Sequence, residues 1–300
     1  MVELTHLVGV LLALGAAISN ASQSLFVRIG TDSGKAYDAV FIVILTNIVV
    51  LTPLVLIIYY PEYGLTRLSW LSFIAAGICG TLLGRLLMYT SLEKIGASRT
   101  VPIIASWALI STILGVLVLG ETLSRIHVAG IVLTVGGVVA IAWETSHENP
   151  DNLSRRELVI GLLIPFGAAV AYGSEPIFAN FGFAEGTPAP VGLVVKTIAA
   201  ALGLVLYLRW RRALPNLALS PAKRWFVLAG IANTLFLLGY YVALTIAPVS
   251  VVTPIIITNT LFVILFSVLF MPQRLERVTG RLVAAAIVVV IGVLLISLYG

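Results

Sequence analysis

The chain has 300 residues, of which 60% are hydrophobic and only 10% are charged, and its formal net charge is +5. A soluble domain carries about 25% charged residues, so this chain has too few to cover a water-facing surface. The composition excludes a soluble globular protein and indicates an integral membrane protein. Because the basic residues are spread among short connections, the net charge does not point to a nucleic-acid partner.

Ten segments are long and apolar enough to cross a bilayer as helices, since a crossing needs about 20 mostly apolar residues. We predict helices over residues 6–28, 38–60, 68–91, 99–119, 125–143, 157–180, 190–209, 222–245, 250–270 and 278–299. The connections are short, and the longest polar one lies at the midpoint of the chain. We therefore expect a first five-helix half over residues 1–145, a polar linker over 146–156 and a second five-helix half over 157–300.

The two halves resemble each other at an offset of 152 residues. The stretch GAAISNASQSLF, 15–26, aligns with GAAVAYGSEPIF, 167–178, and Pro102 in SRTVPII aligns with Pro254 in SVVTPII. Five helices per half is an odd number, so the second half enters the membrane from the opposite side. This predicts inverted repeats, an architecture of secondary transporters. Each proline is expected in the first turn of its helix, where a missing N–H costs little.

Lys and Arg residues favour the connections that follow odd-numbered helices, as at 155–156 and 211–212. The connections after even-numbered helices hold little beyond Arg67 and Arg125. Since positive charge accumulates on the cytoplasmic side, we expect the odd-numbered connections inside the cell and both termini outside.

The fourth and fifth predicted helices carry the most distinctive motif. Small residues and Pro102 open the fourth helix, Gly120-Glu121 ends it, and a glycine-rich fifth helix follows. The second half repeats this through APVSVVTPII, 247–256, but has Pro272-Gln273 in place of Gly-Glu. Layout and motif resemble the drug/metabolite transporter superfamily, particularly its EamA-type members. The resemblance implies two five-helix repeats and transport of small metabolites or drugs, and in some branches of lipid-linked sugars.

Three charged residues fall inside predicted helices, where an ionisable group is costly and usually faces a cavity or a partner. Arg85 lies in the third helix, about six residues from its end, Glu175 late in the sixth and Lys196 early in the seventh. Glu175 and Lys196 are each roughly 8 Å from one membrane face, so they can pair. They either line the substrate path or hold two helices together. Arg85 either meets substrate or extends toward the interface.

Uncharged polar and aromatic residues in the helices form a second group of candidates. Asn20 and Gln23 align with Tyr172 and Glu175 at the repeat offset, so helices 1 and 6 present polar groups at equivalent depths. This predicts a shared midplane cavity, although such residues also form hydrogen bonds between helices. The candidate path residues besides the three charged ones are Asn20, Gln23, Asn47, Tyr172, Asn233, Asn259, Trp107 and Tyr241. The glycines of the third helix, Gly77, Gly80 and Gly84, suit close packing and suggest no chemistry of their own.

No cofactor or metal site is expected. The loop 30–36 departs from the phosphate-binding pattern, and the chain has a single cysteine. We predict a multi-pass cell-membrane protein without enzymatic activity, an exporter or exchanger of a small polar metabolite such as an amino acid or organic anion. Its partners would be that substrate, the bilayer and a coupling proton or counter-substrate, in a monomer or homodimer. The alternatives are a flippase for a lipid-linked sugar or polyprenyl phosphate, which needs a side opening, and a non-transporting receptor or assembly factor.

Overall fold

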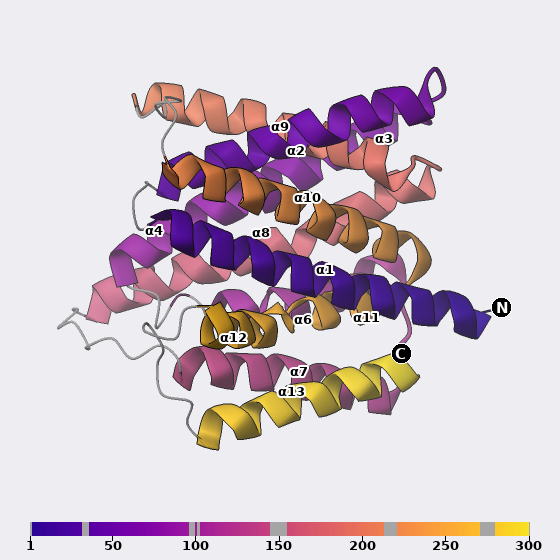
Figure 1. Ribbon diagram of the computed structural model, residues 1–300. Coiled ribbons are helices and arrows are strands. Elements are labelled where there is room, and N and C mark those ends of the chain that lie inside the picture. The colour runs from indigo at the N-terminus through magenta and orange to yellow at the C-terminus, as the bar shows by residue number, and fades with distance from the viewer. Residues whose placement is uncertain are drawn as a thin grey trace.

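The computed structural model describes residues 2–31, 36–95, 100, 103–144, 155–212, 221–270 and 280–299. Within these ranges every regular element is a helix, and together the helices make ten crossings of one bundle (Figure 1). The predicted all-helical fold is confirmed. Pro102, the Pro272-Gln273 turn and residues 146–154 of the expected linker lie outside the described residues.

The crossings follow the predicted segments closely, with ends that differ by a few residues. Crossing 3 consists of three successive helical segments, and crossings 4 and 9 are interrupted. In chain order the crossings are α1 (Val2–Thr31), α2 (Ala36–Tyr59), α3 (Arg67–Ala76) with η1 (Gly77–Gly84) and α4 (Arg85–Ile95), residues 103–105 with α6 (Trp107–Leu119), α7 (Arg125–Glu144), α8 (Arg155–Ala184), α9 (Ala189–Trp210), α10 (Pro221–Ile246), α11 (Val249–Ile256) with α12 (Asn259–Phe270), and α13 (Gly280–Tyr299).

The lengths of these crossings match a bilayer. Among the described residues six helical segments are long and apolar enough to span one, and three further apolar helices are shorter. The 30 residues of α8 extend roughly 45 Å, more than the hydrocarbon core of about 30 Å. Both chain ends lie at the same end of the bundle (Figure 1), as an even number of crossings requires. The chain is a multi-pass membrane protein.

Equivalent helices of the two halves run antiparallel, which is the mark of inverted repeats. Val40, near the start of α2, clusters with Leu208, near the end of α9. Val55, near the end of α2, lines a groove together with Val191, at the start of α9. Since α2 and α9 are the second helix of each half, the second half is inverted relative to the first.

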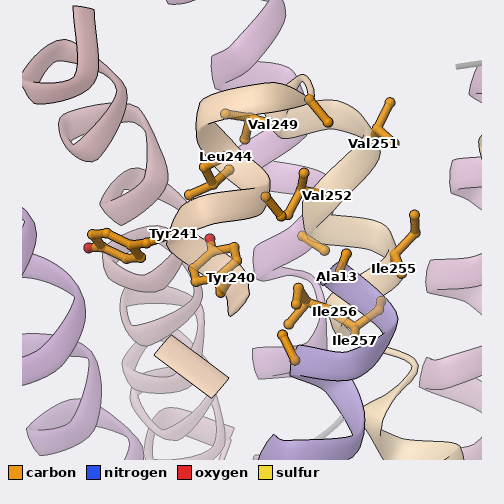
Figure 2. Packing of buried hydrophobic residues seen from close by; sticks show 14 of the residues in the cluster. Ala13, Tyr240, Tyr241, Leu244, Val249, Val251, Val252, Ile255, Ile256 and Ile257 are labelled. Carbon is orange, nitrogen blue, oxygen red and sulfur yellow. The ribbon is translucent and has the colours of Figure 1, made fainter. Parts of the chain in front are cut away.

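The helices of each half pack mainly on helices of the other half. Crossing 1 lies along α10, just as crossing 6 lies along α3, η1 and α4. Crossing 2 contacts α10 as crossing 7 contacts α3 and η1, and α7 packs on its own equivalent, α13. At the centre, Val252 and Ile256 of α11 meet Ala13 of α1 and Tyr240 of α10 in the main hydrophobic core (Figure 2). The core is therefore the interface between the repeats.

Crossings 4 and 9 are interrupted at equivalent positions. Crossing 4 turns at Ser106, whose hydroxyl donates to the Ile103 carbonyl at 2.6 Å. Crossing 9 turns at 257–258, where the Thr258 hydroxyl donates to the Ile255 carbonyl, also at 2.6 Å. Ser106 and Thr258 are separated by the repeat offset of 152 residues. Interrupted helices of this kind are typical of substrate sites in inverted-repeat transporters.

The predicted place of Pro254 in the first turn of crossing 9 is wrong. Pro248 forms the N-cap and α11 begins at Val249, so Pro254 lies in the second turn. A proline there has no N–H to donate to the carbonyl four residues back, which belongs to Ser250. The ring nitrogen Nε2 of His127 lies 3.3 Å from that carbonyl oxygen instead. Pro254 therefore weakens the helix shortly before its interruption.

Candidate functional site

A buried ion pair joins crossings 6 and 7. The ammonium of Lys196 contacts Oε1 of Glu175, and only 2% of the Lys196 side chain and 11% of the Glu175 side chain are exposed. The Tyr241 hydroxyl donates to the same carboxylate oxygen at 3.3 Å. The ammonium also lies 4.6 Å from the centre of the Tyr241 ring, within range of a cation–π interaction. The pairing that the two predicted depths suggested is present.

The pair lies deeper than the sequence suggested. The apolar run around Phe181 extends α8 to Ala184, nine residues beyond Glu175. The following helix, α9, begins at Ala189, seven residues before Lys196. At 1.5 Å per residue these distances are roughly 14 Å and 11 Å, instead of 8 Å. Both charges are therefore in the hydrocarbon region, where each needs the other.

Two glycines of η1, Gly77 and Gly80, pack directly against the residues of this pair. A Cβ atom at Gly80 would collide with the carboxylate of Glu175, and one at Gly77 would collide with the backbone carbonyl of Lys196. A π-helical segment widens crossing 3 at this point, and such segments are frequent at functional sites. The glycines thus do more than allow close packing, because Gly80 leaves the space that the carboxylate occupies.

A cluster of aromatic rings from α3, α8 and α10 adjoins the pair through Tyr241. Phe183 lies edge-on to Tyr241 at 5.6 Å and tilted against Phe73 at 5.5 Å. Tyr240 stacks on Phe236 at 5.7 Å. Figure 2 shows that the hydroxyls of Tyr240 and Tyr241 point in different directions from neighbouring positions of α10. The rings form an apolar wall of the site, and the hydroxyls of Tyr240 and Tyr241 are its polar groups.

Two hydroxyls in the repeat interface are buried without a hydrogen-bond partner among the described residues. They belong to Tyr240, which is 4% exposed, and to Ser111 of α6, which is fully buried. A buried donor without a partner is uncommon and costs free energy. The hydrogen-bonding capacity of these two hydroxyls is therefore unused within the described part of the chain.

An uncharged network joins crossings 1, 2 and 8. The side-chain amides of Asn47 and Asn233 lie 2.7 Å apart, and the Asn233 amide lies 2.7 Å from that of Gln23. The Thr234 hydroxyl lies 2.9 Å from the Asn47 amide. If the Asn47 amide is turned, its nitrogen donates to the Gly230 carbonyl at 3.1 Å. In that orientation the nitrogen also donates to the Thr234 hydroxyl at 2.9 Å.

The ion pair and the amide network occupy equivalent places in the two repeats. Gln23 aligns with Glu175 at the offset of 152 residues, and crossings 1, 8 and 2 correspond to crossings 6, 3 and 7. Gln23 lies eight residues from the end of α1, which places it roughly 12 Å from the opposite membrane face. Each repeat thus places a polar cluster at the equivalent position, and the cluster is charged in one repeat and neutral in the other.

Arg85 is not a member of the ion pair. The side chain is half-buried and lies between α2 and α9, beside Val40, Ile44 and Leu204. It has no ion-pair partner in the described part of the chain. Because α4 continues to Ile95, Arg85 lies ten residues from the end of its crossing, or about 15 Å. The sequence placed it about six residues from that end.

The other candidates lie around these two clusters. Tyr172 packs its ring on Gly84, and its hydroxyl lies 3.8 Å from the sulfur of Met88. Trp107 and Asn259 follow the interruptions of crossings 4 and 9 and are themselves separated by 152 residues. Asn20 is half-buried and has no side-chain hydrogen bond within the described ranges.

Sequence reasoning missed the role of Glu121. Its two carboxylate oxygens accept the backbone N–H groups of Val249 and Ser250, at 2.7 Å and 3.0 Å. These are the first two residues of α11, whose N–H groups have no partner within the helix. The Gly-Glu turn of the first repeat therefore fastens the start of crossing 9 in the second. The motif itself was the available signal.

Comparison with known proteins agrees with this architecture. The model of the EamA-like transporter family matches twice, over residues 7–143 and 159–298. One protein of known crystal structure superposes with a TM-score of 0.80 at 16% sequence identity, over 96% of each chain, and this similarity shows the fold. No curated protein matches the chain in a sequence search. The two family matches cover both repeats, and the chain belongs to the EamA-like transporter family, a family of drug/metabolite membrane transporters.

Proposed function

We propose that the protein is a secondary active transporter, an exporter or exchanger, of a small polar metabolite such as an amino acid or organic anion. The observation that carries this proposal is the Glu175–Lys196 pair. It is buried within the bilayer, against the glycines of the opposite repeat. Intramembrane charges that face a repeat interface are characteristic of substrate and ion pathways.

The chemistry of the site favours an anion or zwitterion over a cation. Lys196 and Arg85 together outnumber Glu175 by one positive charge. A substrate carboxylate would compete with Glu175 for the Lys196 ammonium, and a substrate amine or a coupling proton would then satisfy Glu175. The free hydroxyls of Tyr240 and Ser111 supply further polar contacts.

Alternating access would use the two repeats as bundles on either side of a midplane cavity, divided at residues 146–156. The interruptions at Ser106 and Thr258 supply bending points in crossings 4 and 9. Trp107, Asn259, Tyr172 and Asn20 would line the path near them. The amide network of Gln23, Asn47 and Asn233 would line its other half. No step of this cycle makes or breaks a covalent bond of the substrate.

The proposal is tested by a ligand-binding screen, followed by a transport assay. Purified protein is tested for thermal stabilisation by amino acids, organic anions and phosphorylated metabolites, because a ligand that binds only the folded state raises stability. Ligands that stabilise are then tested for uptake into proteoliposomes, with Lys196→Ala alongside. Uptake that Lys196→Ala abolishes is the expected result. If no compound of these classes is moved and Lys196→Ala alters no binding, the proposal fails.

A lipid flippase is the second candidate, and one observation favours it. A lateral apolar groove runs between α2, α3, η1 and α9, as an acyl chain would require. However, Val195 and Ile78 line the groove, and the charged groups of Glu175 and Lys196 do not. A flippase must carry a charged headgroup past the midplane, and the lining of the groove holds no charged side chain to accompany it. The ion pair therefore supports a metabolite transporter more strongly.

A further inference from the structure

The lateral groove lies outside the proposed transport path. It has a volume of about 610 Å³ and is bounded by the end of α2, the start of crossing 3 and the length of α9. Along α9 it runs from Val191 to Leu206, roughly 22 Å at 1.5 Å per residue. This exceeds the depth of one hydrocarbon leaflet, which is about 15 Å.

The groove opens to the bilayer. Leu56 of α2 and Leu202 and Leu206 of α9 stand at its mouth, and 52%, 62% and 69% of their surfaces are exposed. All three belong to helices that are long and apolar enough to span the membrane. The groove is thus continuous with the lipid-facing surface of a membrane protein, and the surrounding medium at its mouth is hydrocarbon.

The lining decides what can fill this space. Of the residues that line it, Thr52, Tyr63 and Trp70 carry the polar side-chain atoms, and the rest are aliphatic or glycine. The hydroxyl of Thr52 is itself buried without a partner in the described part of the chain. Water needs two to four polar partners in a buried site, which this lining does not offer. An empty groove would forfeit dispersion contacts along its whole length, so a flexible apolar chain suits it best.

The outer end of the groove has features that suit a phosphate headgroup. Arg67 begins α3 and is exposed, one turn before Trp70 on the same face of the helix. Arg binds phosphate oxygens well, and Trp is favoured at the level of lipid headgroups. The carboxylate of Glu185 nearby accepts a hydrogen bond from the Thr66 hydroxyl at 2.8 Å.

We propose that a glycerophospholipid from the bilayer binds this groove as a resident ligand, with one acyl chain between α2 and α9 and its phosphate at Arg67. Val195 and Ile78 form part of the wall, and each is adjacent in sequence to a residue of the Lys196–Gly77 contact. A chain in the groove presses α9 against η1 at this contact and helps to keep the ion pair dry. The lipid is therefore a structural partner of the transport site and not its cargo.

The test measures lipid retained by the full-length protein purified in mild detergent, by native mass spectrometry and by extraction of the same sample. Ala199→Phe places a ring inside the groove, and Leu202→Trp narrows its mouth from an exposed position. Either substitution is expected to lower phospholipid retention by about tenfold or more, since several buried methylene groups lose their contacts. Arg67→Gln should weaken the preference for anionic over zwitterionic phospholipid.

The matched control is Leu235→Phe, at an exposed apolar position of α10 outside the groove. It should retain lipid like the unsubstituted protein. Equal retention in all variants would overturn the proposal, and so would a dimer that Ala199→Phe dissociates, because a second copy would then occupy the groove. Scrambling of labelled phospholipid by the reconstituted protein would make the lipid a substrate instead. Retention does not depend on metabolite transport, so this proposal and the proposed function fail separately.

Discussion

The two polar clusters of the membrane interior have the same plan and different chemistry. In one, Glu175 and Lys196 bring opposite charges together against the glycines of crossing 3. In the other, Gln23, Asn47 and Asn233 join the equivalent crossings through neutral amides. The fold itself does not need charge at this position, because the amide network joins the three equivalent crossings of the other repeat without it.

From this difference we infer that the ion pair, and not the amide network, binds the substrate. An interhelical hydrogen bond between neutral groups contributes about 0.6 kcal/mol, and it costs little to bury. A buried ion pair gains little net stability over apolar residues of similar size, because desolvation offsets the attraction. A pair that the fold could replace at no loss points to a role in binding charge. The following predictions test that reasoning, from the largest expected effect to the smallest.

Removal of one charge should have the largest effect. Glu175→Gln leaves the Lys196 ammonium unpaired in the membrane interior, which should destabilise the protein by about 3–5 kcal/mol. Asn233→Leu, in the neutral cluster, is the matched comparison. Thermal unfolding in detergent measures both variants. Equal losses of stability at the two sites would mean that the charge is not special.

Substitution of Gly80, which packs against the ion pair, should have the next largest effect on stability and transport. A Cβ at Gly80 meets the Glu175 carboxylate, so Gly80→Ala must displace the pair and should cost about 1–3 kcal/mol and most of the transport rate. The control is Gly136→Ala in α7, where the added Cβ meets nothing within 4 Å. There the substitution should be neutral or stabilise the helix by roughly 0.5–1 kcal/mol. Equal stability and equal transport rates of the two variants would show that Gly80 is not needed to hold the ion pair.

The two neighbouring tyrosines separate stability from substrate binding. Tyr241→Phe removes a hydrogen bond to a buried carboxylate and should lower stability by about 1–2 kcal/mol. Tyr240→Phe removes a hydroxyl that has no partner among the described residues, so stability should be unchanged or higher. If substrate uses that hydroxyl, its affinity should fall by about tenfold. Unchanged affinity in Tyr240→Phe would place the substrate elsewhere.

The neutral network should give the smallest effect. Asn233→Leu breaks contacts with two amides and should reduce stability by about 1 kcal/mol. Substrate affinity should change by no more than a few-fold, since the network contributes no charge to the proposed path. A complete loss of binding in this variant, measured by thermal shift with the identified ligand, would make the amides the primary site.

Much of the fold followed from the sequence because apolar run length and the repeat offset both report on the whole chain. The ten crossings and their inversion needed nothing else. The ion pair could be inferred because Glu175 and Lys196 flank a single connection, which places them at similar depth. The site roles of these residues remain predictions.

What the sequence did not show depends on contacts between distant segments. Gly80 acquires its role from a side chain on another helix, and Glu121 from backbone groups of α11. Pro254 lies in the second turn because α11 begins at Val249, where Pro248 forms the N-cap and Glu121 binds the first N–H groups. The interruptions at Ser106 and Thr258 had a signal, namely two hydroxyl residues at the repeat offset, four residues after aligned prolines.

The central claim is that the ion pair serves binding and not folding, and the double variant Glu175→Gln/Lys196→Met tests it most directly. Removing both charges together avoids an unpaired ion, so thermal stability should return to near that of the unsubstituted protein. Substrate uptake into proteoliposomes should nevertheless be lost, because no group remains to bind the substrate's charge. If the double variant recovered transport along with stability, the pair would be a structural link and the account would be contradicted.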